Sequence, residues 1–131
     1  MMMSEIILIA EDNEVLRAAL KEMLSMAGYT MCVAANGVEA LQQMKMLTPH
    51  LIISDISMPE MDGYDFFKAV REQSEWLSIP FIFLSARGTK QDILSGKDLG
   101  AEDYLVKPVH RDELLTAVRS KLDRSNQLRI V

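Results

Sequence analysis

The sequence lacks the features that define several large classes of protein. A single cysteine, Cys32, excludes an internal disulfide, and its apolar neighbours indicate a small buried side chain rather than a reactive thiol. Every apolar run is too short to cross a bilayer, and Met1–Glu5 has no basic segment of the kind that begins a secretion signal. We therefore expect a cytoplasmic protein that does not bind membranes.

The sequence also has fewer basic than acidic side chains. The chain has 14 Lys and Arg residues against 19 Asp and Glu, a net charge of −5, which argues against direct nucleic-acid binding by this domain. We find no internal repeat, low-complexity segment or interdomain linker, and no DNA-binding helix pair, cyclase motif or kinase domain. With 131 residues, 49% apolar and 25% charged, the sequence predicts one globular domain.

Four short apolar runs each lead into reactive polar residues. These runs and the residues that follow them are 6–10 before Glu11 and Asp12, 51–53 before Ser54 and Asp55, 81–84 before Ser85, and 104–106 before Lys107 and Pro108. If the runs are parallel strands of one sheet, their carboxyl ends lie side by side, at the edge where open α/β sheets bind ligands. Three carboxylates, a hydroxyl and an ammonium would then share one crevice, which would suit a divalent cation and a phosphoryl group.

Strand-like and helix-like patterns alternate along the chain. The predicted strands are 6–10, 30–35, 51–54, 81–84 and 104–106, and the predicted helices are 15–24, 38–46, 63–72, 89–99 and 111–122. The helix over 89–99 is the weakest, because Ser95 and Gly96 lower its propensity. Gly28 is expected to end the first helix in a left-handed conformation, and Gly63 to end a loop in a conformation that other residues avoid. Five strands that each precede a helix predict a parallel sheet covered on both faces.

Four segments resemble the receiver domain of two-component response regulators. They are Ala10–Asn13, Ser54–Gly63, Leu84–Ala86 and Gly100–Pro108, in the order and spacing of that family. The resemblance covers residues 5–122 and leaves 123–131 as a C-terminal tail or the start of a linker. It implies a flavodoxin-like, doubly wound α/β fold, in which a five-stranded parallel sheet of order 2-1-3-4-5 has helices on both faces.

The resemblance also implies roles for the acidic residues. Asp55 corresponds to the phosphoacceptor, whose carboxylate becomes an acyl phosphate. Glu11 and Asp12 correspond to the acidic pair that holds Mg²⁺. By analogy Asp12 and Asp55 bind the ion directly, Glu11 acts through water, and the backbone carbonyl of Ser57 supplies another ligand. The structural alternatives are a strand-end Asp55 that caps the next turn, and an acidic pair that favours a helix N-terminus.

The remaining site residues follow from the same resemblance. Lys107, Ser85 and Ala86 correspond to residues that contact or border the phosphoryl group, and the peptide bond between Lys107 and Pro108 is usually cis in the family. Ser85 corresponds to the switch hydroxyl, and Tyr104 to the aromatic side chain that turns inward with it. Their alternatives are a surface lysine, a turn serine and a partly buried tyrosine with a solvated hydroxyl.

The resemblance implies a phosphoryl-accepting signalling switch in a two-component phosphorelay. Such a protein is not a metabolic enzyme, although it assists its own phosphorylation and dephosphorylation. The expected donor is a histidine kinase or phosphotransfer protein, and the expected cofactor is Mg²⁺. The signal would pass to an unknown output domain or effector protein, or to a homodimer formed through the last two helices and the last strand. Residues 123–131 either extend the last helix or form a frayed terminus.

Three other functions share parts of this pattern. A flavodoxin-type electron carrier would need a hydroxyl- and glycine-rich phosphate loop where this chain has Glu11–Glu14. A haloacid-dehalogenase-like phosphatase would need a second acid at the position of Ser57. A degenerate receiver used only for docking would lack key site residues, all of which are present here.

Overall fold

The chain alternates strands and helices, and its computed structural model describes residues 4–86 and 103–130, with side chains described as far as Arg124. The strands are β1 (Ile6–Ala10), β2 (Thr30–Ala34), β3 (Leu51–Asp55), β4 (Phe81–Ser85) and β5 (Asp103–Val106). The helices are α1 (Glu14–Met26), α2 (Gly37–Met46), α3 (Gly63–Arg71), the short 3-10 helix η1 (Ser74–Trp76) and α5 (Arg111–Ile130). The helix predicted over 89–99 lies outside the described residues.

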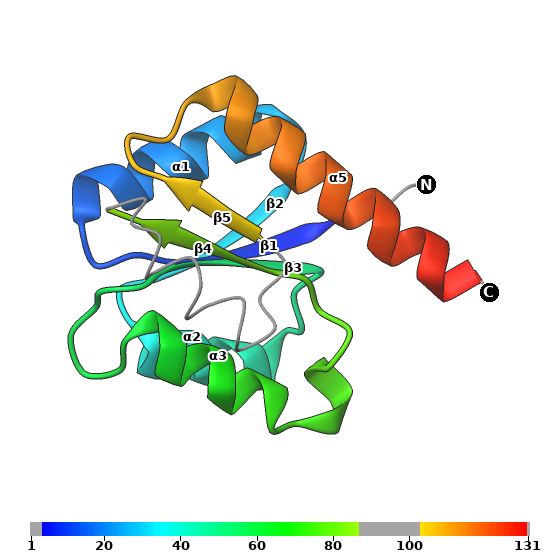
Figure 1. The fold of residues 1–131 in the computed structure, drawn as a ribbon, viewed down its shortest axis with the longest axis horizontal. Coiled ribbons are helices and arrows are strands. Elements are labelled where there is room, and N and C mark those ends of the chain that lie inside the picture. Colours follow the sequence, from blue (N-terminus) through cyan, green and yellow to red (C-terminus); the bar gives the residue numbers. More distant parts are fainter. Residues whose placement is uncertain (1–3, 87–102, 131) are drawn as a thin grey trace.

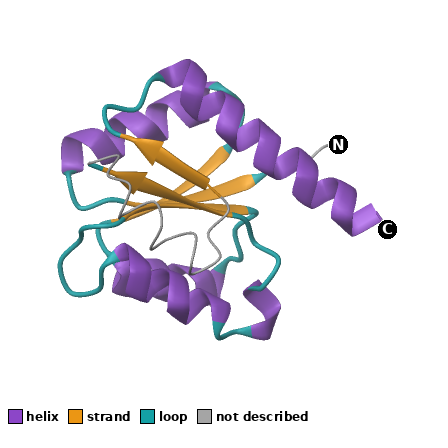
Figure 2. Ribbon diagram, in the orientation of Figure 1, coloured by secondary structure: helices purple, strands orange, loops and turns teal. Residues whose placement is uncertain are grey.

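All five strands belong to one parallel sheet in the order β2-β1-β3-β4-β5. Helices α1 and α5 cover one face of this sheet, and α2 and α3 cover the other (Figure 1). Figure 2 shows the resulting layers, with the strands between the two groups of helices. The predicted flavodoxin-like fold is therefore confirmed, and the carboxyl ends of β1, β3 and β4 lie next to one another along one edge.

The central strands are buried on both sides of the sheet. In β1, Ile7 and Ile9 pack toward α1 and α5, whereas Leu8 and Ala10 pack toward α2 and α3. Every residue of β3 and β4 is buried. Strands in this position need apolar residues on both faces, which explains why the sequence shows continuous apolar runs rather than alternation.

Three of the helices begin at a side-chain cap. Asn13, Asn36 and Asp62 each accept a hydrogen bond from the backbone N–H three residues further on, at 2.8 to 3.0 Å. Gly28, just after α1, has a φ of 102°, so its predicted left-handed conformation is confirmed. The three side-chain caps fix where the loops that follow β1, β2 and β3 end.

The prediction that Gly63 adopts a conformation that other residues avoid is wrong. Gly63 does not adopt a positive φ, but a Cβ at this position would overlap the backbone oxygen of Asp55. Its N–H donates a hydrogen bond to the carbonyl of Ile56 at 2.8 Å, which requires this close approach. The left-handed residue of the loop is instead Glu60, with a φ of 67°. Glycine is needed here for space between two backbones, not for an unusual conformation.

Helix α5 is longer than its apolar pattern predicts. Its buried residues, Leu114, Leu115, Val118 and Leu122, are those expected from the sequence. The helical backbone nevertheless continues to Ile130 and projects beyond the sheet (Figure 1). The backbone from residue 123 to residue 130 therefore extends the last helix rather than forming a frayed terminus.

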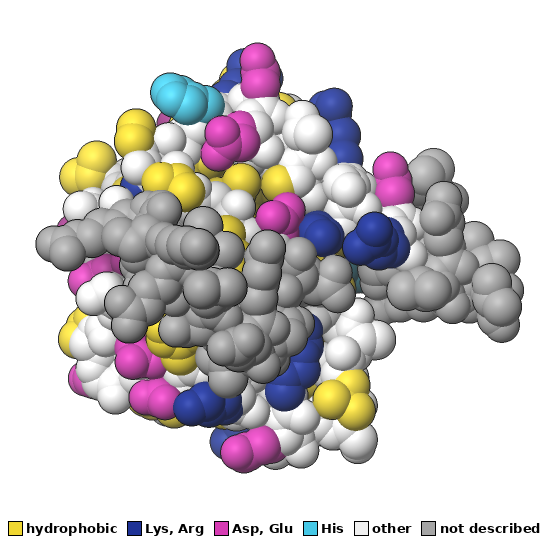
Figure 3. All heavy atoms as spheres, in the orientation of Figure 1, with side chains coloured by type: hydrophobic (Ala, Val, Ile, Leu, Met, Phe, Trp, Pro, Cys, Tyr) yellow, Lys and Arg dark blue, Asp and Glu magenta, His cyan; other side chains and the backbone are white. Residues whose placement is uncertain are grey.

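The described surface is mixed in character. On the face shown in Figure 3, acidic and basic side chains lie among one another rather than in separate areas. Cys32 packs against the core between the sheet, α2 and α3, but it is only half-buried, which is less than predicted. Within residues 4–86 and 103–130, no helix is both long enough and apolar enough to span a membrane.

Candidate functional site

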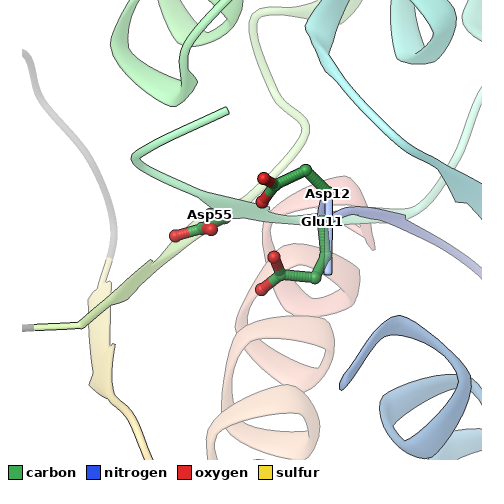
Figure 4. A group of neighbouring side chains, drawn as sticks. All are labelled: Glu11, Asp12 and Asp55. Carbon is green, nitrogen blue, oxygen red and sulfur yellow. The ribbon is translucent and has the colours of Figure 1, made fainter. Parts of the chain in front are cut away.

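Three carboxylates meet beyond the ends of β1 and β3. Oxygen atoms of Glu11, Asp12 and Asp55 all lie within 4.8 Å of one another, and Figure 4 shows these groups facing a common space. The proximity arises because β1 and β3 are neighbours, with Ala10 opposite Ser54. Glu11 is fully buried and Asp55 is 5% exposed, whereas Asp12 is open to solvent. Asp12 is thus the carboxylate that an ion arriving from solvent can reach most easily.

Lys107 brings a positive charge into this group. Its Nζ atom lies 2.8 Å from Oε1 of Glu11 in an ion pair, and it donates a hydrogen bond to Oδ2 of Asp55 at 3.1 Å. The backbone N–H of Lys107 donates to the carbonyl of Ser85, and the peptide bond to Pro108 is cis. Burial acts to lower the pKa of Lys107, but the two carboxylates outweigh it and raise that pKa. The ammonium therefore stays charged.

Glu11 is held at both its side chain and its backbone. Its Oε2 atom accepts a hydrogen bond from the N–H of Asn13 at 3.1 Å, and its carbonyl accepts one from Nη1 of Arg17 at 2.8 Å. Burial raises the pKa of Glu11 to about 7, and the negative charge of Asp55 adds to this effect. Lys107 and the Asn13 N–H act in the opposite direction but do not cancel it. Near neutral pH the carboxyl of Glu11 exists in both protonated and charged forms.

Replacement of Glu11 by glutamine should stabilise the metal-free protein above pH 7. Because folding raises the pKa of this acid from 4.5 to about 7, the folded state binds more protons and stability falls as pH rises through that range. Glutamine imitates the protonated acid. We expect Glu11→Gln to be about 1–3 kcal/mol more stable than wild type at pH 8, and much closer to it at pH 5. Urea unfolding in EDTA measures both values.

The matched control for this experiment is Glu22→Gln, at an exposed position on α1. It should change the free energy of unfolding by less than about 0.5 kcal/mol at either pH. An effect of Glu11→Gln that is the same at pH 5 and pH 8 would show that the buried acid does not have a raised pKa.

The ends of β4 and β5 complete the surroundings of Asp55. The register of β3 and β4 places Ser85, which is 1% exposed, just beyond Asp55 on the neighbouring strand, and the adjacent Ala86 is exposed. Tyr104 lies opposite Phe83, with 5.4 Å between the ring centroids, and its hydroxyl oxygen is buried. The tyrosine therefore points into the protein and does not carry the solvated hydroxyl of the structural alternative.

The loop from Ile56 to Asp62 follows Asp55 and carries Ser57. Ser57 is exposed, whereas Met58 is buried and Met61 packs against the core beneath α2 and α3. The two methionines therefore have the packing role expected from the sequence. The structure thus brings Glu11, Asp12, Asp55 and Lys107 together, with Ser85 on the adjacent strand end and Ser57 on the adjacent loop.

Comparison with known proteins identifies the family. A model of the response regulator receiver domain matches residues 7–119. The chain is 40% identical over 119 residues to the "Probable transcriptional regulator ycf27" of Cyanophora paradoxa, which covers 91% of this chain and 48% of the relative. The chain therefore belongs to the response regulator receiver domains, which act in two-component signalling. It spans about half the length of this curated relative.

Solved structures of receiver domains share the fold closely. The chemotaxis response regulator CheY4 of Vibrio cholerae has a TM-score of 0.86 and 34% identity, covering 91% of this chain and 99% of that one. The receiver domain of a sensor histidine kinase from Pseudomonas aeruginosa has a TM-score of 0.85 and 29% identity, covering 92% of this chain and 99% of that one. A magnesium ion is coordinated in the active-site cleft of the Pseudomonas protein.

Proposed function

We propose that the protein is a phosphoryl-accepting switch of a two-component phosphorelay, with Asp55 as the acceptor. The observation that carries this proposal is the convergence of the Asp12 and Asp55 carboxylates with the Lys107 ammonium at one edge of the sheet. A nucleophilic carboxylate, a second acid and a fixed cation are the groups that phosphoryl transfer to an acid requires. The phosphatase alternative is disfavoured, because Ser57 stands where its second acid would be.

Mg²⁺ is the cofactor that this group of residues fits. The side-chain donors are carboxylate oxygens, which this ion prefers, and they lie close enough together to share it. Asp12, Asp55 and the backbone carbonyl of Ser57 would bind the ion directly. Glu11 would act through water, because its two oxygens already contact Lys107 and the N–H of Asn13. When bound, the ion would offset negative charge on the phosphoryl oxygens.

The transfer itself exchanges one bond to phosphorus for another. The N–P bond of a phosphohistidine breaks while an oxygen of Asp55 forms the O–P bond of an acyl phosphate, and the imidazole takes a proton from solvent. Lys107, 3.1 Å from Oδ2 of Asp55, is placed to hold a phosphoryl oxygen as negative charge arrives. The Ser85 hydroxyl would then bind another phosphoryl oxygen, and the small Ala86 would leave room for the donor.

The donor is proposed to be a histidine kinase or phosphotransfer protein, and the output surface is proposed to lie on β5 and α5. A groove of about 690 Å³ runs between these elements and is lined by residues that include Tyr104, Val106, Glu113 and Thr116. Tyr104 is among the lining residues, and its ring packs against Phe83 on the α2 and α3 side of the sheet, so a movement of this ring after phosphorylation would alter the strand that forms one wall of the groove. An output domain, an effector protein or a second copy of the chain would bind there.

Incubation with acetyl phosphate tests the proposed function. We expect the protein to gain the mass of one phosphoryl group, and the product to be stable in acid and lost in alkali, as an acyl phosphate is. The gain should require a divalent metal, since EDTA would remove the ion that offsets the charge of Asp12 and Asp55. Intact-mass spectrometry with Mg²⁺ and with EDTA measures both. Equal phosphorylation in the two samples would refute the metal requirement.

A further inference from the structure

We infer that Gly37 and Met61 are positioning residues for the metal site and act through the loop that carries Ser57. This inference rests on the proposed function, since it concerns the carbonyl that would complete the coordination of Mg²⁺. Neither residue is one of the groups that would hold the ion. They determine instead where the loop of residues 56–62 lies relative to Asp55, from which the loop begins.

The amino end of α2 supports this loop at its far side. The N–H of Gly37 donates to the carbonyl of Met61 at 3.3 Å, and Nδ2 of Asn36 donates to Oε2 of Glu60 at 3.4 Å. Asn36 also caps α2 by accepting a hydrogen bond from the N–H of Glu39. The start of α2 and the end of the loop are therefore held together, on the face where α2 and α3 pack side by side (Figure 1).

The side chain of Met61 rests directly on Gly37. A Cβ at Gly37 would lie 2.8 Å from Cγ and 2.9 Å from Sδ of Met61, and 3.0 Å from Cβ of Phe66. Phe66 is fully buried in the core, so it has little freedom to move away. A methyl group at this position would therefore displace Met61. Since Gly37 has no positive φ, glycine serves this contact rather than an unusual backbone conformation.

A displacement of Met61 would reach Ser57 because the loop is a closed unit. The N–H of Met61 donates to the carbonyl of Pro59 at 2.7 Å, and the N–H of Gly63 donates to the carbonyl of Ile56 at 2.8 Å. Ser57 lies within the segment that the Gly63–Ile56 hydrogen bond closes, the Met61–Pro59 bond tightens the far part of the same segment, and the Ser57 side chain is exposed. Movement at Met61 would therefore shift the Ser57 carbonyl relative to Asp55 and weaken the binding of Mg²⁺.

A double-mutant cycle of Gly37→Ala and Met61→Ala tests this inference, with Mg²⁺ titrations followed by the NMR signals of backbone amides. Gly37→Ala alone should weaken Mg²⁺ affinity about tenfold, as is typical when support of a metal ligand is lost. It should also move the signals of residues 56–62 in metal-free protein. In the Met61→Ala background the contacts at 2.8 and 2.9 Å are gone and the added methyl group meets only Cβ of Phe66 at 3.0 Å, so Gly37→Ala should change the affinity less than about twofold.

Gly28→Ala is the control for a general loss of stability, because a Cβ there would meet no atom within 4 Å but would strain a residue with a φ of 102°. It should lower the free energy of unfolding and leave Mg²⁺ affinity unchanged. Equal weakening by Gly37→Ala in both backgrounds, or none in the wild-type background, would overturn the inference. If Gly37→Ala does not fold, the Mg²⁺ affinity of Met61→Ala is the test. An affinity equal to that of wild type would then overturn the inference. Wild-type protein that binds no Mg²⁺ would refute the proposed metal site itself.

Discussion

Asp55→Asn should take up no phosphoryl group from acetyl phosphate under conditions in which wild type is modified. Asparagine keeps the size of the side chain at this buried strand end and can still accept a hydrogen bond from Lys107, which is 3.1 Å from Asp55 in the wild type. An amide is not a nucleophile that forms an acyl phosphate, so the reaction loses its acceptor. Intact-mass spectrometry measures the loss directly.

The matched control for this variant is Asp65→Asn. Asp65 is an exposed aspartate in the first turn of α3, outside the site, and it should be replaced without change in the extent of phosphorylation. Phosphorylation of Asp55→Asn at the wild-type level would mean that another residue is the acceptor. Loss of phosphorylation in both variants would mean that the result at Asp55 is not specific.

Lys107→Met should slow phosphoryl uptake about 100-fold or more. It removes the cation that contacts Asp55 and would hold a phosphoryl oxygen, and loss of one such donor commonly has an effect of this size. Lys107→Arg keeps the charge but replaces a compact ammonium with a larger planar group, so it should recover only part of the rate. The rate of mass gain with acetyl phosphate and Mg²⁺ measures each variant.

Lys68→Met, on the exposed side of α3, is the control and should retain the wild-type rate. Lys107→Met should also raise the pKa of Glu11 further, because Lys107 acts to lower it in the wild type. Retention of the wild-type rate by Lys107→Met would contradict the role of this residue.

The strands and the acidic site could be predicted because a buried strand has a simple pattern of apolar residues in the sequence. A parallel strand covered on both faces needs an uninterrupted apolar run, so β1, β3 and β4 could be placed to within a residue. The closeness of their carboxyl ends depended on the strand order, which the resemblance to receiver domains implied and the structure confirms. Asp55 ends β3, whereas Asp12 and Lys107 follow the ends of β1 and β5, so this order brings the three residues to one edge.

The supports of the site could not be predicted, because they depend on contacts between distant segments. Nothing in the sequence around Arg17 indicates that its guanidinium donates to the carbonyl of Glu11, since an arginine on an amphipathic helix usually faces solvent. The same holds for Met61 on Gly37 and for Gly63 against the backbone of Asp55. At both glycines a side chain would overlap a neighbouring segment. This overlap can be recognised only once α2, α3 and β3 are packed together.

The length of α5 was left open between two alternatives for a different reason. The regular spacing of apolar residues ends at Leu122 and residues 123–127 are all polar, so the sequence gives no clear helical signal beyond that point. The helical backbone nevertheless continues to Ile130 and projects beyond the sheet (Figure 1). The proposed output surface on β5 and α5 therefore adjoins a helix that projects from the domain (Figure 1).

The location of the phosphoryl group tests the central claim most directly. Hydroxylamine converts an acyl phosphate into a hydroxamate, so peptide mass spectrometry after this treatment marks the residue that was phosphorylated. We expect the mark on Asp55 alone, in protein treated with acetyl phosphate and Mg²⁺, and no mark in EDTA. A hydroxamate on Glu11, on Asp12 or on any other residue, with Asp55 unmarked, would contradict the assignment of Asp55 as the acceptor.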